Sequence, residues 1–334
     1  MTDNKIAFFG VKSWERPIIE REIINLEAYG VGLFEEELQE KLELAKEYDV
    51  ISTFIYSKAD KEILDKLPKL KMIATRSTGI DHINFEECEK RKIEIANVPV
   101  YGSNTVAEYA MALILAVSKK IVEAHQAVEE DEFNPEGLTG IDLFGKNLGI
   151  VGLGKIGANV AKMARGFGMK ILAVEKFPDE KVVKKYKVKL VDLDTLLKES
   201  DVVTLHVPAL KETYHLINRN NIKLMKKGSI LVNTSRGAVV ETESIIWALN
   251  KGILRGVGLD VVEEEDKIES MSLVMSQRPT KNDLQNVLSY HMLRDREDVV
   301  FTPHNAFNTE EAIERIIKTT IENIKNFINK TNGI

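Results

Sequence analysis

The chain has 334 residues, of which 44% are hydrophobic, enough to form two domains that each have a core. The net charge is −6, and the lysines are scattered among acidic residues rather than gathered in a block, which excludes a basic face for nucleic acid. No apolar run approaches the length of a membrane span and the first five residues lack the apolar stretch of a secretory signal, so we expect a cytoplasmic protein whose partner is a small molecule.

The first hundred residues alternate short apolar segments with charged amphipathic ones. We predict strands at 5–9, 50–54, 70–75 and 93–97 and a helix at 15–29. This alternation predicts a small α/β domain. Cys88 is the single cysteine, which excludes an internal disulfide and a zinc site built from cysteines; we expect a buried bystander and no metal site.

Proline and glycine interrupt this pattern at 98–104, and the alanine- and leucine-rich residues 105–122 then predict a long helix. We interpret the two as a hinge followed by a crossing helix. Strands predicted near residues 147, 170, 201, 229, 256 and 299 alternate with helices, which is typical of a doubly wound sheet. Residues 309–329 carry isoleucines at helical spacing, so we predict a terminal helix that returns to the first domain and makes it discontinuous.

A glycine-rich turn, Gly152-Leu153-Gly154-Lys155-Ile156-Gly157, lies between a predicted strand at 146–151 and a predicted helix at 158–167. In such a turn one glycine makes the bend, the second lets the backbone approach a pyrophosphate, and the third lets helix pack on strand. The next strand ends at Glu175, whose carboxylate can bind the ribose hydroxyls of NAD and repel the 2′-phosphate of NADP. We therefore expect NAD, while Lys176 beside the acid leaves NADP open.

Three strand ends carry residues suited to hydride transfer, because open α/β sheets bind ligands beyond the carboxyl ends of their strands. The strand at 229–234 leads to Arg236, the strand at 256–262 leads through Asp260 to Glu265, and the strand at 299–302 leads to His304. Arginine offers a planar fork to a substrate carboxylate. Histidine exchanges a hydroxyl proton near neutral pH, and a carboxylate partner holds the ring and favours its charged form.

Other interpretations remain open for several polar residues. Glu265 stands among three further acids, Glu263, Glu264 and Asp266, and a solvated acidic turn has the same appearance in sequence. We expect surface or packing roles for four of the six histidines: His82, His125, His215 and His291. His206 follows a predicted strand, and we expect it to shape the cofactor cleft.

Taken together, these motifs and their order resemble the D-isomer-specific 2-hydroxyacid dehydrogenase family, with the D-lactate dehydrogenase branch as the best match. The resemblance covers nearly the whole chain. The segments that carry it are 76–83, 97–101, 152–157, 206–208, 233–237, 258–261, Glu265 and 302–304. The branch is suggested by residues 98–101, by the extended stretch after Glu265 and by the run at 303–307.

The resemblance implies a role for each matching residue of the catalytic site. His304 is the acid/base, Glu265 its partner and Arg236 the carboxylate anchor. The other side of the carboxylate is bound by the backbone at Thr78, Gly79 and Ile80, and the walls of the pocket are Tyr101, Phe54 and Phe307.

For the cofactor, the resemblance places Gly152, Gly154, Lys155, Ile156 and Gly157 at the pyrophosphate, Glu175 at the adenosine ribose, His206, Val207, Pro208 and Thr213 along the adenosine half, and Thr234, Ser235 and Asp260 at the nicotinamide. The family more often has aspartate where this chain has Glu175.

The implied fold is two doubly wound domains, a Rossmann NAD-binding domain at 104–304 inserted into a flavodoxin-like substrate domain at 1–103 and 305–334. The resemblance also implies closure about hinges at Tyr101 and Pro303, and a homodimer through the NAD-binding domains and the helix at 105–122. The expected reaction is NADH-dependent reduction of pyruvate to D-lactate. Alternatives are another 2-oxo acid (hydroxypyruvate, glyoxylate, a branched or an aromatic one) or a non-catalytic NAD(H)-sensing regulator.

Overall fold

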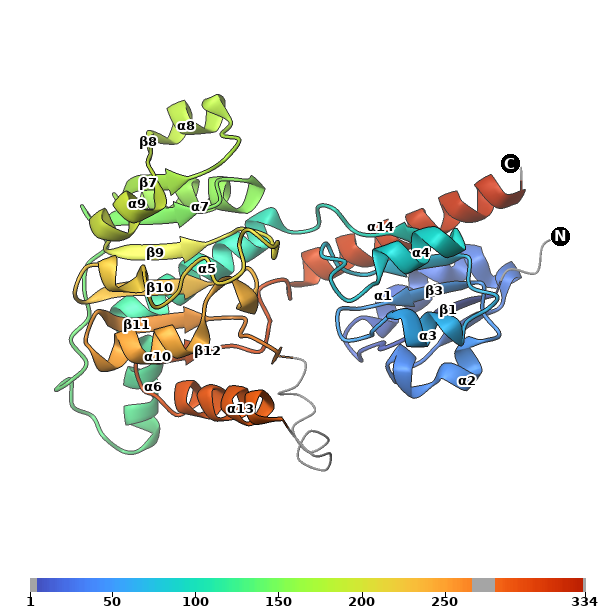
Figure 1. Ribbon diagram of the computed structural model, residues 1–334, viewed down its shortest axis with the longest axis horizontal. Coiled ribbons are helices and arrows are strands. Elements are labelled where there is room, and N and C mark those ends of the chain that lie inside the picture. The colour runs from blue at the N-terminus through green and yellow to red at the C-terminus, as the bar shows by residue number, and fades with distance from the viewer. Residues whose placement is uncertain (1–4, 266–279, 333–334) are drawn as a thin grey trace. The chain divides into compact units, whose positions relative to one another are not determined.

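The computed structural model describes residues 5–265 and 280–332 (Figure 1). It separates into two compact units: unit 1 comprises Met1–Gly102 with Asn308–Ile334, and unit 2 comprises Ser103–Phe307. The predicted boundaries differ from this division by one residue at the first junction and three at the second. No helix within the described ranges is long and apolar enough to cross a membrane.

Unit 1 contains a parallel five-stranded sheet in the order β2-β1-β3-β4-β5, the flavodoxin-like order. The strands are β1 Ile6–Phe8, β2 Val31–Leu33, β3 Val50–Thr53, β4 Met72–Thr75 and β5 Glu94–Ala96. Strand β2 was not predicted, because its three residues lie at the sheet edge, are only partly buried and include Gly32. The other four lie within their predicted ranges.

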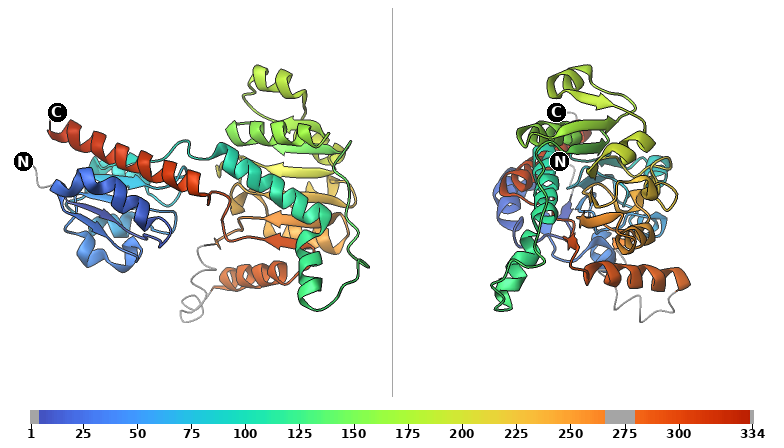
Figure 2. Two further views of the ribbon diagram at one scale, coloured as in Figure 1. Left: turned by 180° about the vertical axis from the view of Figure 1, so that it is seen from behind. Right: turned by 90° about the vertical axis from the view of Figure 1, so that its left-hand side faces the viewer.

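Helices cover both faces of this sheet (Figures 1 and 2). They are α1 Arg16–Glu22, α2 Leu42–Ala45, α3 Lys61–Asp65, α4 Phe85–Arg91 and α14 Glu310–Asn332, with 3-10 turns η1 Ile23–Tyr29 and η2 Leu38–Glu40. The helix predicted at 15–29 is confirmed as an α-helix in its first half, α1, whereas its second half is a 3-10 helix. Helix α14 packs Ile317, Ile321 and Ile324 against Ile6 and Phe8, so the end of the chain completes the first core. Cys88 is buried in α4.

Unit 2 contains a parallel seven-stranded sheet in the order β12-β11-β10-β9-β6-β7-β8. The strands are β6 Asn147–Val151, β7 Lys170–Val174, β8 Val188–Leu190, β9 Val202–Leu205, β10 Ser229–Asn233, β11 Leu254–Leu259 and β12 Val299–Phe301. In chain order this is the Rossmann arrangement with one added strand. The predicted six strands omit β8, which has one buried residue and lies at the edge.

The helices of unit 2 are α5 Ser103–Lys119, α6 Ile121–Glu129, α7 Lys155–Gly166, α8 Glu180–Tyr186, α9 Leu193–Glu199, α10 Thr242–Asn250 and α13 Lys281–Arg294, with 3-10 turns η3 Ile222–Leu224 and η4 Gly237–Val239. The long helix predicted at 105–122 is confirmed by α5 as far as Lys119 and is wrong at its end, because Lys120 adopts φ 53° and separates α5 from α6. Helix α5 crosses closely over β11, where a Cβ on Gly256 would lie 2.6 Å from Val117.

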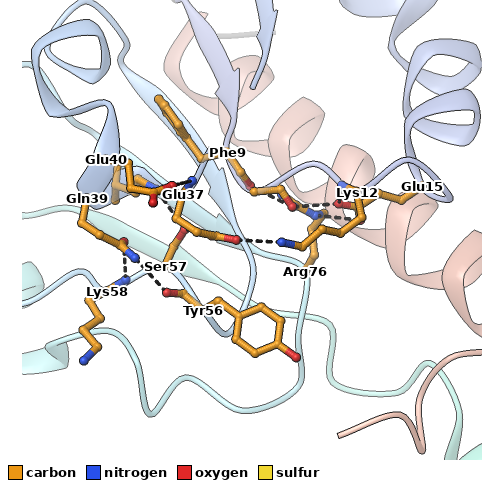
Figure 3. Close-up of polar contacts among 12 residues, drawn as sticks. Phe9, Lys12, Glu15, Glu37, Gln39, Glu40, Tyr56, Ser57, Lys58 and Arg76 are labelled. Atoms are coloured by element: carbon orange, nitrogen blue, oxygen red, sulfur yellow. Dashed lines mark hydrogen bonds and ion pairs between the residues drawn. The ribbon is translucent and has the colours of Figure 1, made fainter. Parts of the chain in front are cut away.

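A buried ion pair between Arg76 and Glu15 lies in unit 1 (Figure 3). Arg76 follows β4 and is fully buried, with its guanidinium 3.0 and 3.1 Å from the two carboxylate oxygens of Glu15. The same guanidinium donates to the carbonyls of Phe9 and Gly10 and to Ser52 Oγ. Arg76 therefore joins the ends of β1, β3 and β4, and sequence reasoning gave it no role of its own.

We predict that Arg76→Met lowers the free energy of unfolding by about 3–5 kcal/mol, because it leaves the Glu15 carboxylate buried without its countercharge. Urea denaturation followed by circular dichroism measures this change. Arg21→Met is the matched control, since Arg21 is exposed and pairs with Glu22 and Glu314; its cost is expected below about 1 kcal/mol. Equal effects of the two variants would contradict the assigned role of Arg76.

Candidate active site

The glycine-rich turn joins β6 to α7, and each of its three glycines meets a different constraint. Gly152 has φ +94°, and a Cβ there would lie 2.7 Å from the carbonyl oxygen of His206. A Cβ on Gly157 would lie 2.1 Å from the carbonyl oxygen of Gly152, so only glycine lets the helix pack so closely. A Cβ on Gly154 would meet no protein atom within 4 Å. Gly154 therefore leaves the N-terminus of α7 open to a phosphate.

The carboxylate of Glu175 reaches back from the end of β7 to this turn. Its Oε2 accepts a hydrogen bond of 2.7 Å from the backbone N–H of Leu153, and its Oε1 accepts one of 3.0 Å from Phe177 N–H. An acid held against the glycine turn lies where the ribose of a dinucleotide is bound in this fold. Lys155 and Ile156 form the first turn of α7, with Lys155 exposed and Ile156 packed against the core.

The segment after β9 lies against the same turn. Val207 Cγ1 would lie 2.9 Å from a Cβ on Gly152, and a hydrogen bond of 2.6 Å from Thr213 Oγ1 to the Pro208 carbonyl closes the loop that follows. His206 contacts Thr204 Oγ1 through Nε2, while its buried Nδ1 has no hydrogen-bond partner in the described part of the chain. Burial lowers the pKa of His206 to about 3, so its ring is uncharged at neutral pH.

Asn233 organises the turn that presents Arg236 after β10. Its Oδ1 accepts hydrogen bonds from the backbone and hydroxyl of Ser235, and its Nδ2 donates to the Arg236 carbonyl at 2.9 Å. The Arg236 guanidinium is partly exposed and donates to the Ser235 carbonyl. The buried Thr234 Oγ1 finds no hydrogen-bond partner among residues 5–265 and 280–332, which leaves it available to a ligand.

His304 and Glu265 form the predicted pair. His304 Nδ1 lies 2.6 Å from Glu265 Oε1, and both side chains are partly buried. Because the carboxylate can only accept a hydrogen bond, Nδ1 carries a proton and Nε2 is the ring atom left for substrate. The predicted extended stretch after Glu265, including Asp266, lies outside the described residues.

Asp260 connects the ends of β11 and β12 and thereby sets the backbone around His304. Its Oδ1 accepts hydrogen bonds from Thr302 Oγ1 and Asn305 N–H at 2.6 and 2.8 Å, and its Oδ2 accepts one from Ala306 N–H at 2.9 Å. Burial raises the pKa of Asp260, although these hydrogen bonds oppose the shift. His304 N–H donates to the Asp260 carbonyl, and His304 has φ 49°.

A second histidine–carboxylate pair lies in the same turn. His215 Nε2 is 2.5 Å from Glu263 Oε1, and Glu263 Oε2 accepts hydrogen bonds of 2.7 Å from the backbone and hydroxyl of Thr242. Glu263 is thus bound to the start of α10, and the interpretation of these acids as a wholly solvated turn is wrong. Sequence reasoning missed this pair, because the two residues are 48 positions apart.

The predicted substrate residues of unit 1 follow the carboxyl ends of its strands. Phe54 comes directly after β3 and is buried, with its ring at 5.7 Å from that of Tyr56 in an edge contact. The Tyr101 carbonyl accepts a hydrogen bond from Arg315 in α14. Phe307, in contrast, is the last residue of unit 2 and follows Ala306, which Asp260 binds.

The backbone carbonyls of residues 78–80 all accept hydrogen bonds. Asn97 Nδ2 donates to the Thr78 carbonyl at 2.7 Å, Ser77 Oγ donates to the Gly79 carbonyl at 2.6 Å, and Ile83 N–H donates to the Ile80 carbonyl. The N–H groups of these three residues donate to no acceptor in the part of the chain that the structure describes. Successive unpaired N–H groups form a concavity that binds anions such as carboxylates.

The site of unit 2 thus places a dinucleotide-binding turn, a carboxylate-bound histidine and an arginine at the carboxyl ends of one sheet, which defines a nicotinamide-dependent hydride-transfer enzyme. The model of the D-isomer specific 2-hydroxyacid dehydrogenase family, NAD binding domain, matches residues 111–306. The chain belongs to the D-isomer-specific 2-hydroxyacid dehydrogenase family, and it is an NAD-dependent oxidoreductase.

Relatives in this family have different substrates in their names. Glyoxylate reductase of Thermococcus litoralis is 41% identical over 290 residues, covering 85% of this chain and 81% of the relative. D-lactate dehydrogenase of Escherichia coli is 32% identical over 329 residues, 96% of each chain. The crystal structure of D-lactate dehydrogenase from Aquifex aeolicus, complexed with NAD and lactic acid, superimposes with a TM-score of 0.87 at 34% identity, covering 98% of this chain and 96% of that one.

We predict that Gly154→Ala weakens NADH binding about tenfold or more, roughly 1.4 kcal/mol, without unfolding the protein. The new methyl group meets no protein atom but would occupy space that the pyrophosphate needs. Fluorescence titration with NADH measures the affinity, and a thermal melt measures the stability. Gly166→Ala, at the far end of α7 and equally unobstructed, is the control and leaves NADH affinity unchanged. Normal NADH affinity in Gly154→Ala would contradict the assigned pyrophosphate site.

Proposed function

We propose that the protein reduces pyruvate to D-lactate with NADH. The observation that carries this proposal is the His304–Glu265 pair, because the carboxylate 2.6 Å from Nδ1 leaves Nε2 as the one ring nitrogen able to exchange a proton with substrate. Bound NADH supplies the hydride to the C2 carbon of the substrate. The acid that protonates the C2 oxygen is then His304.

In the proposed mechanism, the protonated His304 ring donates its Nε2 proton to the developing alkoxide. The Glu265 carboxylate accepts the hydrogen bond from Nδ1 and holds the ring in place. Arg236 presents a planar guanidinium that can bind the substrate carboxylate through two parallel hydrogen bonds. Oxidation of the hydroxy acid runs the same steps backwards, with neutral His304 as the base.

We infer that the N–H groups of residues 78–80 bind a substrate carboxylate. These N–H groups donate to no acceptor within the described residues, so they can bind an anion. The pocket walls proposed for the substrate side chain are Tyr101, Phe54 and Phe307.

The choice of pyruvate is supported by the share of this chain that aligns with D-lactate dehydrogenases. The D-lactate dehydrogenases of Escherichia coli and Aquifex aeolicus align with 96% and 98% of this chain, whereas the glyoxylate reductase of Thermococcus litoralis aligns with 85%. The higher identity of that reductase, 41%, makes glyoxylate the second candidate. These substrates differ by one methyl group, which is worth only about 1–3 kcal/mol in an apolar pocket.

A panel of 2-oxo acids tests the proposed function. The purified protein is assayed with NADH and pyruvate, glyoxylate, hydroxypyruvate, phenylpyruvate or 2-oxoisocaproate, and the best substrate is repeated with NADPH. We expect the highest kcat/KM with pyruvate, D-lactate as the product, and slower turnover with NADPH, which Glu175 repels. A preference for glyoxylate would replace the first candidate by the second. Tight NADH binding without turnover would contradict both and favour an NAD(H)-sensing regulator.

We predict that Glu265→Gln lowers kcat for reduction about tenfold or more while the Kd for NADH stays unchanged. A hydrogen bond to a carboxylate is about twice as strong as one to a neutral amide, so the variant holds the Nδ1 side of the His304 ring less firmly. Steady-state rates and fluorescence titration with NADH measure the two constants. Glu264→Gln removes an equal charge from the same turn and is expected to leave kcat in place. A native kcat in Glu265→Gln would contradict the pairing.

We propose that the chain forms a homodimer through the NAD-binding domain. We place its interface at α6 and the segment after it rather than along the whole predicted helix at 105–122, because the apolar residues of α5 pack into the core of unit 2. Helix α6 has no buried residue, and its Ile121 and Val128 are 54% and 53% exposed, while Phe133 is 95% exposed. Large exposed apolar side chains close together in the sequence support a protein–protein interface here. Light scattering should give about twice 37.7 kDa for the native chain and the single mass for Val128→Glu. Ile24→Glu, at an exposed apolar residue of unit 1, is the control. A monomeric native chain would contradict the proposal.

We also propose that the protein is cytoplasmic.

A further inference from the structure

The loop at residues 78–80 is held by a chain of buried hydroxyl groups that begins at a histidine. Thr75 Oγ1 lies 2.8 Å from Ser77 Oγ and 3.1 Å from His82 Nε2, and Ser77 Oγ donates to the Gly79 carbonyl at 2.6 Å. Thr75 and Ser77 are both buried. All four residues belong to unit 1, so the contacts lie within one compact body.

The chemistry of these groups determines which atom donates at every step. A carbonyl oxygen only accepts, so the Ser77 hydroxyl proton is committed to Gly79. The bond between Ser77 and Thr75 must then use the Thr75 proton, and Thr75 can only accept from the histidine. His82 must therefore carry a proton on Nε2, a tautomer assignment that the distances alone do not give.

This order of donors also determines where the loop points its own N–H groups. The C=O and N–H of a trans peptide group point in opposite directions. Because Ser77 holds the Gly79 carbonyl toward the interior of unit 1, the N–H of Ile80 is turned the other way. Asn97 acts in the same manner on the Thr78 carbonyl, which turns the N–H of Gly79.

We propose that His82 and Thr75 are positioning residues that set the affinity of the loop for the substrate carboxylate. This inference rests on the proposed function of residues 78–80 and extends it, because it names the groups that hold their N–H donors ready. Neither residue touches the substrate; both act through Ser77. The backbone of His82 is itself fixed, since its carbonyl accepts a hydrogen bond of 2.9 Å from Ala59 N–H.

We call the hydrogen-bonded series His82–Thr75–Ser77–Gly79 the relay. Matched substitutions test it in the full-length enzyme with NADH bound. Gln at position 82 can place an amide N–H near the position of Nε2, whereas Asn is too short and ends near Nδ1. We expect His82→Asn to raise the KM for the best 2-oxo acid and the inhibition constant of oxamate about tenfold, with kcat and the Kd for NADH changed less than about threefold. His82→Gln should restore both constants to within about threefold of the native values.

Thr75 offers a second matched pair. Thr75→Val keeps the shape but removes the donor, and it should raise KM and the oxamate constant as His82→Asn does; Thr75→Ser keeps the hydroxyl and should not. If the two residues had only a structural role, the variants would lower the melting temperature and kcat together. They would not raise KM and the inhibition constant of oxamate specifically. Native constants in both His82→Asn and Thr75→Val would overturn the proposal.

The tautomer gives a test that needs no turnover. Nitrogen-15 NMR of the histidine rings in the full-length enzyme with NADH and oxamate, with His82 assigned through the His82→Gln variant, should show a proton on Nε2. A His82 ring with its only proton on Nδ1 would overturn the relay whatever the enzyme reduces. Conversely, failure of the native enzyme to reduce any 2-oxo acid would overturn the proposed function. The NMR measurement of the His82 tautomer would still show whether the hydrogen bonds run in the proposed order.

Discussion

The buried carboxylate of Asp260 is the constraint on which the proposed catalytic edge of unit 2 depends. It follows β11 and accepts hydrogen bonds from Thr302, Asn305 and Ala306, which flank His304 on both sides in the chain. Burial alone would disfavour the charged form and raises the pKa of this group, so these donors are needed to offset the cost. With the segment after β12 held in this way, His304 takes its left-handed backbone conformation and lies against Glu265.

The strand order of unit 2 creates a position next to that edge where this fold can bind a dinucleotide. The chain moves outward from β6 to β7 and β8 and then returns to β9 on the other side of β6, which creates a switch point between β6 and β9. Ligands bind at such points, beyond the carboxyl ends of the strands. Here the glycine turn after β6 contacts His206 and Val207 after β9, so the two sides of the switch point touch directly. In unit 1, Arg76 binds Glu15 and holds the ends of β1, β3 and β4 together through hydrogen bonds to Ser52 and to the carbonyls of Phe9 and Gly10.

Much of this arrangement could be predicted from the sequence, because the features involved are local. The glycine fingerprint, the acid at Glu175 and the polar residues after each long strand depend on neighbours in the chain, and parallel strands bring their carboxyl ends to one edge. The edge strands β2 and β8 could not be predicted, since three residues with little burial leave no alternating pattern. The break at Lys120 was also hidden, because the apolar residues continue past it. The pairs Arg76–Glu15 and His215–Glu263 join residues 61 and 48 positions apart, and no local pattern reveals such contacts.

The most direct test of the account is a single-turnover measurement of hydride transfer in His304→Gln, using the best 2-oxo acid from the native enzyme. His304 is proposed to transfer a proton and not to bind the cofactor, so the variant should bind NADH as tightly as the native chain. Oxidation of bound NADH should slow by about 10²–10⁴-fold, the range typical for loss of a general acid. Hydride transfer at the native rate in this variant would contradict the central claim that the Glu265-bound histidine is the acid of the reaction.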